Sequence, residues 1–473
     1  MNIATLRRAT LASLAVLTLT VTVTTPARAA AVPSADRLAA GVTTGALLDH
    51  LRALQSVADR SGGDRGYDGV GFTRSVDYVE GRLRAAGYRV TRQTVPYTDF
   101  AVSTETLTAG GAPVPVLMTR FTPSTPAQGL TAPVAALPAG STGCAAGDYL
   151  GVTGRIVVLP RAACGYTAQQ QAAAAAGAAA VLIYYPTPKP DNNYRFLAYT
   201  PDDFTIPMAS VSQRDGENLI KRSTAGLRVH LTLRGAGTPR TTTNLFAETS
   251  GGDPDNVVMA GGHLDAVTEG PGINDNGSTS AATLQTALAL APYQAQVTNK
   301  VRFAWWGAEE LVDVGSAYYV THLSDAERAR IALLLNGELL GSPNSGRFVW
   351  DQGSGGSHVI ADLFAGYLDR QKLRYQRTSP DSVGSDHLEF LPVGIPVGGI
   401  DGGNLGLKTP EQQALFGGRA GQMFDPCYHQ PCDRVENLDT SALTTNARAM
   451  AWVLARLATS ADDVRAVRTA PAS

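Results

Sequence analysis

Five side chains in the second half of the chain are of the types that bind transition metals. They are His263, Asp275, Glu310, Glu338 and His429. Imidazole together with carboxylate is a donor set that suits zinc. One catalytic zinc uses only three protein ligands, so five donors favour two zinc ions bridged by one carboxylate. Such a pair, roughly 4 Å apart, can activate a water molecule while it holds the carbonyl or the amine of a substrate.

Neighbouring residues add the groups that hydrolysis needs. Glu309 and Glu310 are adjacent at the end of an expected strand, so their side chains diverge. One can bind metal while the other faces the attacking water as general base. Asp265 follows His263 by two residues and is placed to orient its imidazole. The hydroxyl of Tyr428 is placed to donate to the oxyanion of a tetrahedral intermediate.

Each of these residues taken alone has an ordinary structural explanation. An aspartate before a helix, such as Asp275, is usually an N-cap, and a Glu-Glu pair is usually solvated surface. The metal centre is favoured because the candidates follow successive strands of one segment. Four other histidines have no partner motif and are interpreted as structural: His50, His230, His322 and His358.

The run Ser385-Asp386-His387 allows two interpretations. Asp386 together with Glu389 resembles a capping box, whereas a Ser/Asp/His cluster suggests a nucleophile. The chain contains no G-x-S-x-G elbow, so the capping box is favoured. It also contains no H-E-x-x-H motif, P-loop or dinucleotide fingerprint.

The elements around the candidate residues are predicted to alternate between strand and helix. The predicted strands are 256–261, 301–306 and 331–336, and the predicted helices are 278–291, 315–323 and 441–457. This alternation is typical of an α/β domain with a mostly parallel sheet. Such sheets bind ligands at the carboxyl ends of their strands, which is where His263, Glu310 and Glu338 fall.

Two segments precede this one. The first is expected to contain a helix with Leu47 and Leu51 on one face, a helix at 73–86 that Gly87 ends, and a strand at 90–97. The second, residues 105–238, is rich in small residues, with few charges and no cluster of metal-binding side chains. Its predicted elements are a strand at 155–159, a helix at 167–180, a strand at 181–185 and a loop at 186–207.

The composition narrows the class of protein and its compartment. The formal net charge of the 473 residues is −2, which indicates neither nucleic acid nor an acidic membrane as partner. Residues 1–29 combine Arg7 and Arg8, a short apolar run and Ala27-Arg28-Ala29, which predicts a secretory signal peptide. A membrane anchor is disfavoured because the run is shorter than the ~20 residues that span a bilayer.

Four cysteines agree with export to an oxidising compartment. Four cysteines allow three pairings, and proximity in the sequence favours Cys144 with Cys164 and Cys427 with Cys432. The alternatives are reduced thiols or a metal site formed by the cysteines.

Six runs of the sequence, in order, resemble the motifs of one enzyme family: GGHLDAV, GINDNGS, RFAWWGAEELVDVGS, LLNGELLGSPN, GSDHLEF and FDPCYHQPCD. They are similar to those of the secreted bacterial leucyl-aminopeptidase type of di-zinc exopeptidase, whose relatives include carboxypeptidases and glutaminyl cyclases. The similarity covers most of residues 240–460. In the preceding segment, GRIVVLPRAACGYTAQQQAAAAAGAAAVLIYY resembles a protease-associated domain.

The resemblance implies a role for each candidate residue. Asp275 would bridge two zinc ions. His263 and Glu338 would complete one site, and Glu310 and His429 the other. Glu309 would be the general base and Tyr428 the oxyanion partner.

Two positions depart from the family pattern. The family usually has Asp where this chain has Glu338, but the longer carboxylate can still bind zinc, so activity is expected to survive. Close relatives have Arg where this chain has Gly384, so their substrate specificity does not transfer directly.

The predicted architecture is a mostly parallel α/β sheet flanked by helices, as in zinc exopeptidases, with a small inserted protease-associated domain. The predicted boundaries are 1–29 for the signal peptide, 36–104 for the first part of the peptidase domain, 105–238 for the inserted domain, 239–460 for the catalytic domain and 461–473 for the tail.

The predicted function is removal of the first residue of peptides, with a preference for large apolar first residues, by a secreted monomer that binds two zinc ions. Neither nucleic acid nor, after signal cleavage, a membrane is expected as partner, and a calcium site is left open. The alternatives are a carboxypeptidase or glutaminyl cyclase with the same metal centre, or a binding protein with an impaired site.

Overall fold

The computed structural model describes residues 32–186, 190–196, 203–353 and 355–469. The predicted signal peptide, residues 1–29, lies outside the described residues. Within them, no helix combines the length and the apolar character needed to cross a membrane.

The helices and strands have the following bounds. The helices are α1 (Ala35–Ala40), α2 (Thr44–Asp59), α3 (Val70–Ala85), α4 (Gly165–Ala175), α5 (Gln213–Ser223), α6 (Gly277–Leu290), α7 (Val314–Thr321), α8 (Asp325–Arg330), α9 (Gly355–Arg370), α10 (Pro410–Phe416) and α11 (Thr440–Ala458). The strands are β1 (Arg89–Ala109), β2 (Ala112–Val114), β3 (Leu117–Met118), β4 (Leu130–Ala136), β5 (Ile156–Pro160), β6 (Ala180–Tyr184), β7 (Met208–Ser210), β8 (Arg228–Glu248), β9 (Asp253–His263), β10 (Asn299–Trp306), β11 (Ile331–Glu338), β12 (Phe348–Trp350), β13 (Gln376–Thr378) and β14 (Val397–Asp401). Two short 3₁₀ turns also matter for the site, η3 (Glu309–Leu311) and η5 (Asp386–Glu389).

The centre of the sheet is parallel, as the sequence predicts. Strand β9 pairs in parallel with β10 on one side and with β11 on the other, and β11 pairs in parallel with β14. The eight residues of β11 are all buried, which is typical of a parallel strand that is covered on both faces. Strand β8 extends the sheet antiparallel to β10, so the sheet is mixed at its edge. The predicted fold class is therefore confirmed.

Helices cover the sheet because alternate strand residues point to opposite faces. Trp305 of β10 packs in a cluster with apolar residues of α2, α6, α9 and α11. The next residue, Trp306, packs in a separate cluster with Tyr319 of α7 on the other face. This alternation with period two fixes which side of each strand carries a polar residue at its end.

A second group of elements lies between residues 100 and 233. Strands β4, β5, β6 and β7 pair in parallel in that order. Ile156 and Val158 face one apolar cluster, and Val157 and Leu159 face another. The predicted helix at 167–180 is too long at its C-terminal end. Helix α4 ends at Ala175 because Gly177, with φ +82°, turns the chain, and Ala180 already belongs to β6.

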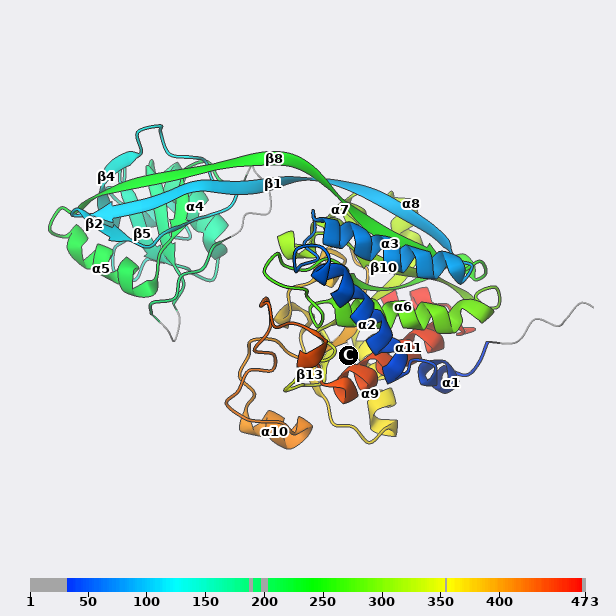
Figure 1. Ribbon diagram of the computed structural model, residues 1–473. Coiled ribbons are helices and arrows are strands. Elements are labelled where there is room, and N and C mark those ends of the chain that lie inside the picture. The colour runs from blue at the N-terminus through cyan, green and yellow to red at the C-terminus, as the bar shows by residue number, and fades with distance from the viewer. Residues whose placement is uncertain (1–31, 187–189, 197–202, 354, 470–473) are drawn as a thin grey trace, which may run out of the picture. The chain divides into compact units, whose positions relative to one another are not determined.

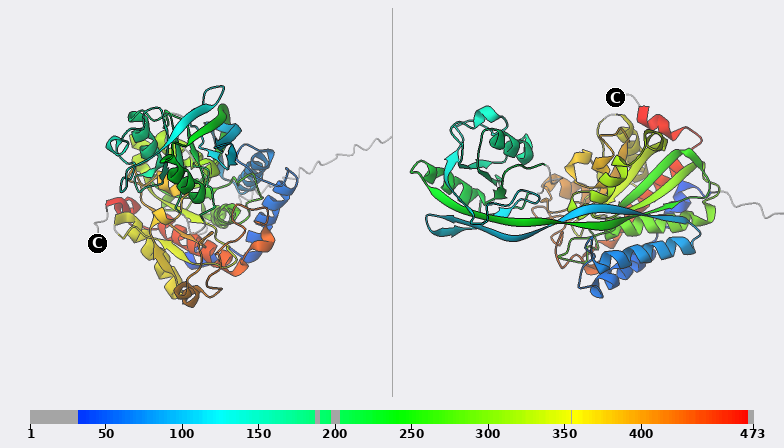
Figure 2. Two further views of the ribbon diagram at one scale, coloured as in Figure 1. Left: turned by 90° about the vertical axis from the view of Figure 1, so that its left-hand side faces the viewer. Right: turned by 90° about the horizontal axis from the view of Figure 1, so that it is seen from above.

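Two long strands were largely missed by sequence analysis. The predicted strand at 90–97 continues to Ala109, and its partner β8 was not predicted. The two strands run antiparallel and side by side from Arg89–Glu248 to Ala109–Val229 (Figures 1 and 2). Their central part is mostly exposed or half-buried, so it lacks the apolar alternation by which strands are recognised.

Candidate metal centre

The five predicted metal ligands meet at the carboxyl ends of the parallel strands. His263 is the last residue of β9 and Glu338 is the last residue of β11, and both are almost completely buried. Asp275 lies in the loop before α6, Glu310 in η3 after β10, and His429 in the loop between Cys427 and Cys432. Ligand atoms of His263, Asp275 and Glu338 lie within 4.8 Å of one another, and so do those of Asp275, Glu310 and His429.

Asp275 belongs to both groups. Its Oδ1 lies 3.3 Å from Nε2 of His263, and its Oδ2 lies 3.1 Å from Nε2 of His429. Nε2 of His429 also lies 3.1 Å from Oε2 of Glu310, and Nε2 of His263 lies 3.9 Å from Oε2 of Glu338. One carboxylate therefore faces two separate sets of donors, as a bridge between two metal ions requires.

Asp433 holds the bridging residue in place. Its carboxylate accepts hydrogen bonds from the backbone N–H of Asn274 at 2.7 Å and of Asp275 at 3.0 Å. The N-cap of α6 is Asn276, whose side chain accepts from Thr279, so the N-cap interpretation of Asp275 is wrong. The carboxylate of Asp275 is thereby free to face the two histidines.

Asp265 links the ends of β9 and β10. Its two carboxylate oxygens accept hydrogen bonds from the backbone N–H of Glu309 and of Glu310, at 3.2 and 3.3 Å. Its Oδ1 also lies 3.6 Å from Nδ1 of His263. Asp265 thus positions an imidazole and both glutamates, whereas sequence analysis expected only the contact with His263.

The two adjacent glutamates diverge as the sequence predicts. Ala308 before them and Val312 after them have positive φ angles, +60° and +68°, so the chain turns tightly through η3. Glu310 faces His429, while Oε2 of Glu309 lies 3.7 Å from Nε2 of His263. Only Glu310 of the pair joins the group around His429, but ligand atoms of Glu309, Glu310 and His263 also lie within 4.8 Å of one another.

Ser385 orients Glu338 and does not bond to His387. Its hydroxyl donates to Oε1 of Glu338 at 2.5 Å and accepts from the amide of Asn336 at 3.1 Å. The predicted capping box is wrong, because η5 has no side-chain cap. His387 instead donates from Nε2 to the carbonyl of Pro380 and stacks on Trp350.

Arg65 joins the loops that carry His263 and Asp275. Its buried guanidinium donates to the backbone carbonyls of Leu264, Pro271 and Gly272. Sequence analysis did not identify this residue, because an arginine some 200 positions before its partners carries no local signal of their proximity.

Electrostatics favour a cation in this cluster. Burial, followed by the neighbouring charge of Asp275, raises the pKa of Glu310 to about 7. Burial also raises the pKa of Glu338 well above its usual range. His429 responds in the opposite sense: burial disfavours its charge, but hydrogen bonds to Asp275 and Glu310 raise its pKa to about 10. Divalent cations would remove this repulsion between carboxylates, so the donor set fits zinc.

Tyr428 lies beside the cluster. Its ring stacks on His429, with centroids 3.8 Å apart and an angle of 16° between the planes. Burial, followed by the charges of the nearby carboxylates, raises the pKa of the phenol well above 10. The hydroxyl therefore keeps its proton at neutral pH and can donate a hydrogen bond.

The cysteines pair as proximity in the sequence favours. Cys144 is bonded to Cys164, and Cys427 is bonded to Cys432. The second bond closes the short loop that carries Tyr428 and His429. The four histidines interpreted as structural, His50, His230, His322 and His358, belong to no metal-binding group among the described residues.

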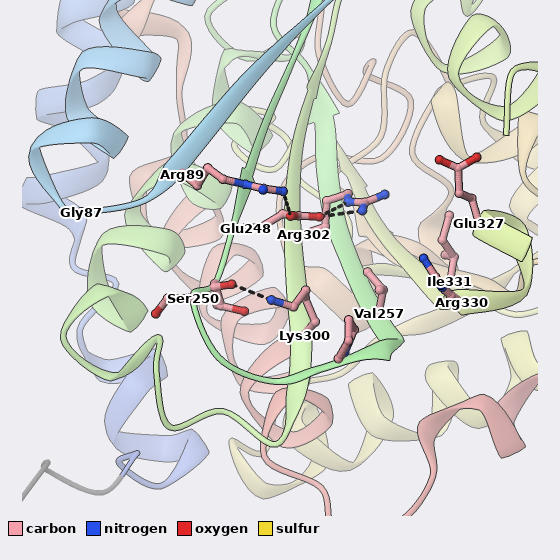
Figure 3. Close-up of a pocket in the computed structure, with 12 residues that line it drawn as sticks. Gly87, Arg89, Glu248, Ser250, Val257, Lys300, Arg302, Glu327, Arg330 and Ile331 are labelled. Carbon is pink, nitrogen blue, oxygen red and sulfur yellow. Dashed lines mark hydrogen bonds and ion pairs between the residues drawn. The ribbon is translucent and has the colours of Figure 1, made fainter. Parts of the chain in front are cut away.

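A cavity of about 500 Å³ lies near the opposite ends of the strands. It is lined by Val257 and Ile331 near the starts of β9 and β11, and by several charged side chains (Figure 3). Those charges already have partners: Glu248 bonds to both Arg89 and Arg302. None of the predicted metal ligands lines this cavity, so it is not the predicted catalytic site.

Comparison with known proteins identifies the family. Residues 244–454 match the model of peptidase family M28, and residues 130–219 match the PA domain. An aminopeptidase of Pseudomonas aeruginosa is 37% identical over 439 residues, covering 88% of this chain and 81% of the relative. Leucine aminopeptidase 2 of Trichophyton rubrum is 34% identical, covering 87% and 83%.

The fold has solved counterparts as well. A zinc aminopeptidase from Bacillus subtilis superposes with a TM-score of 0.63 at 23% identity, covering 86% of this chain and 94% of that one. A relative that is 37% identical covers 88% of this chain, and the PA-domain match precedes the peptidase match. This chain therefore belongs to peptidase family M28.

Proposed function

We propose that the protein is a secreted aminopeptidase that uses two zinc ions to hydrolyse the first bond of peptides. The observation that carries the proposal is the position of Asp275, whose two oxygens face His263 and His429 separately. Relatives described as aminopeptidases, covering most of the chain, support the choice of bond.

The proposed metal ligands divide into two sets around Asp275. His263 and Glu338 would hold one ion, and Glu310 and His429 the other. When bound, the metal pair supplies the Lewis acidity that acidifies water and polarises a carbonyl. Glu338 reaches the cluster although the family usually has a shorter aspartate there, which supports retention of activity.

Two residues would move or hold protons during hydrolysis. Glu309 lies beside His263, and its carboxylate would take the proton of the attacking water as general base. Tyr428 would donate its hydrogen bond to the oxyanion of the tetrahedral intermediate. Asp265 and Ser385 act on other residues: the first positions His263 and the glutamates, and the second orients Glu338.

The substrate would be the free N-terminus of a peptide. A relative described as a leucine aminopeptidase supports the expectation of large apolar first residues. Secretion is supported by the signal-peptide pattern and by the two disulfide bonds.

The test is release of the chromophore from leucine para-nitroanilide by purified mature protein, with and without chelator. We expect activity that chelator abolishes and zinc restores. Glu309→Ala should lower kcat on the order of 10²–10⁴-fold, the usual effect of losing a general base. The matched control is Glu411→Ala on the exposed side of α10, which should leave the rate unchanged.

The outcome also separates the alternatives. A zinc-loaded protein that turns over no N-terminal amide would contradict the proposal. That result would favour the alternative that the same metal centre serves a carboxypeptidase or a glutaminyl cyclase. A protein that binds no zinc would favour the binding-protein reading.

A further inference from the structure

A cavity of about 170 Å³, which we name the selectivity pocket, is lined by residues that neighbour Glu338 in the chain and in the sheet. Leu339, the residue after Glu338, forms part of its wall. Asp401, the last residue of β14, forms another part and is the register partner of Glu338 in the adjacent strand. The wall of the pocket therefore includes the residue that follows Glu338 in the chain and the residue beside Glu338 in the sheet.

Most of the wall is suited to an aliphatic chain. Leu339, Phe348 and Phe424 contribute apolar surface. Such a wall buries the methylene groups of any long first residue, which favours its binding. This part of the pocket agrees with the expected preference for large first residues.

Asp401 makes the wall different from a purely apolar one. Its carboxylate is nearly buried and accepts two neutral donors, the indole N–H of Trp350 at 2.7 Å and the backbone N–H of Gly403 at 2.9 Å. No cation among the described residues pairs with it: Lys408, on the same loop as Gly403, donates to the carbonyls of Ser345 and Gly417 instead. Burial without a cationic partner raises the pKa of Asp401 to about 7, so a cation in the pocket would favour the charged form of this carboxyl group.

A second polar group on the wall lacks a partner. The hydroxyl of Thr378, at the end of β13, is buried and has no hydrogen-bond partner among the described residues. Trp350 is itself fixed, since its ring stacks on His387 with centroids 4.1 Å apart. The pocket thus combines apolar sides with a fixed carboxylate and an unused hydroxyl, which matches a side chain with an aliphatic stem and a cationic end.

We propose that the selectivity pocket binds the first side chain of the substrate and that Asp401 makes it favour lysine and arginine. The proposal rests on the aminopeptidase function proposed above. In this arrangement the stem packs on Leu339, Phe348 and Phe424, and the ammonium or guanidinium pairs with Asp401. Leucine remains a substrate because it uses the apolar wall, but it leaves the carboxylate without a cation.

The test compares para-nitroanilides of lysine, norleucine and leucine with zinc-loaded enzyme. Norleucine has the same stem as lysine without the ammonium group, so their ratio of kcat/KM isolates the contribution of the charge. We expect lysine to exceed norleucine by roughly tenfold or more, the usual size of a charge-assisted hydrogen bond. A ratio near one in the wild-type enzyme would overturn the proposal without any variant.

The variant is Asp401→Asn, which keeps the shape of the side chain and an acceptor for Trp350. It should lower the ratio of lysine to norleucine at least tenfold. The matched control is Asp381→Asn, an exposed aspartate near the pocket that does not line it. Equal losses on all three substrates would show that Asp401 only supports Glu338, and would also overturn the proposal. Failure of the proposed function would look different, because no amide would then be turned over.

Discussion

At the scale of single residues, the centre depends on side chains that do not themselves meet a metal. Asp433 holds the backbone of the bridge, Asp265 holds both glutamates, and Ser385 holds Glu338. Residues that orient ligands typically change metal affinity or activity 10–100-fold when they are removed. The hydrogen bond from Ser385 restrains the side chain of Glu338, which supports the proposal that this residue serves in place of a shorter aspartate.

Ser385→Ala should weaken zinc binding and lower kcat/KM roughly 10–100-fold, because Glu338 loses the donor that orients it. The measurements are zinc affinity by competition with a chromogenic chelator, and kinetics at saturating zinc. Ser324→Ala is a useful control: it removes the capping serine of α8, should cost about 1 kcal/mol of stability, and should leave zinc affinity unchanged. Loss of all activity with zinc affinity intact would instead favour a nucleophilic serine.

His387 should make stability depend on pH. Burial lowers the pKa of its imidazole to about 4, against about 6.5 in an unfolded chain. Between these values the unfolded chain binds the proton and the folded chain does not, so the free energy of unfolding falls as pH decreases from about 6.5 to about 4. The loss should reach about 3 kcal/mol, corresponding to the difference between the two pKa values.

The check is chemical unfolding of metal-free protein across this pH range, for the wild type and for His387→Gln. The wild type should lose more stability on acidification than the variant does. Parallel curves for the two proteins would contradict a buried neutral histidine at this position.

At the scale of elements, the carboxyl ends of β9, β10 and β11 bring together residues that loops alone would not align. His429 is the exception, because it lies in a loop and has a positive φ of +57°. The bond between Cys427 and Cys432 closes this loop and leaves His429 facing Asp275 and Glu310. The loop therefore takes over the role that a strand end plays for the other ligands.

The double variant Cys427→Ser, Cys432→Ser lacks that disulfide. It should bind zinc roughly tenfold or more weakly at the site containing His429, an effect similar to that of removing other groups that orient ligands. The matched change is Cys144→Ser with Cys164→Ser, which removes a bond near α4, far in sequence from every proposed ligand. It should lower thermal stability and leave zinc stoichiometry unchanged. Equal zinc binding in both double variants would show that the short loop keeps its shape without the bond.

At the scale of the whole molecule, the proposed ligands join segments separated by 166 positions, from His263 to His429. A ligand that binds only the folded state stabilises it by mass action, by about 4 kcal/mol at a thousand times its dissociation constant. The metal pair should therefore contribute to the stability of the peptidase core as well as to chemistry.

Chelation should lower the melting temperature, and zinc should restore it in a concentration-dependent way. Asp275→Asn should lose most of this zinc-dependent shift, because it alters the residue shared by both sets of donors. Glu309→Ala should keep the shift despite being inactive, since it is proposed as the base and not as a ligand. The measurement is differential scanning calorimetry of the wild type, Asp275→Asn and Glu309→Ala, each with and without zinc. Loss of the zinc-dependent shift in Glu309→Ala would indicate that Glu309 is a ligand.

The sequence alone determined the parts of this protein whose signals are local. His263, Glu310 and Glu338 could be placed because each follows a buried apolar strand, and strand ends in a parallel sheet converge. The α/β class followed from the same alternation. Both disulfide pairs followed from proximity in the sequence.

Only the tertiary structure decided the contacts between distant segments. Arg65, Asp433 and Ser385 act across separations of 47 to 207 positions, and no local pattern announces them. Strand β8 escaped prediction because its central part lacks a buried face. Asp401 was not singled out in the sequence, and it became a candidate for specificity only once the fold placed it beside Glu338 with no cationic partner among the described residues. The hydrophobic pattern of a sequence indicates which face of a helix or strand is buried. The partner of a buried charge comes from a distant segment, so it is known only from the folded structure.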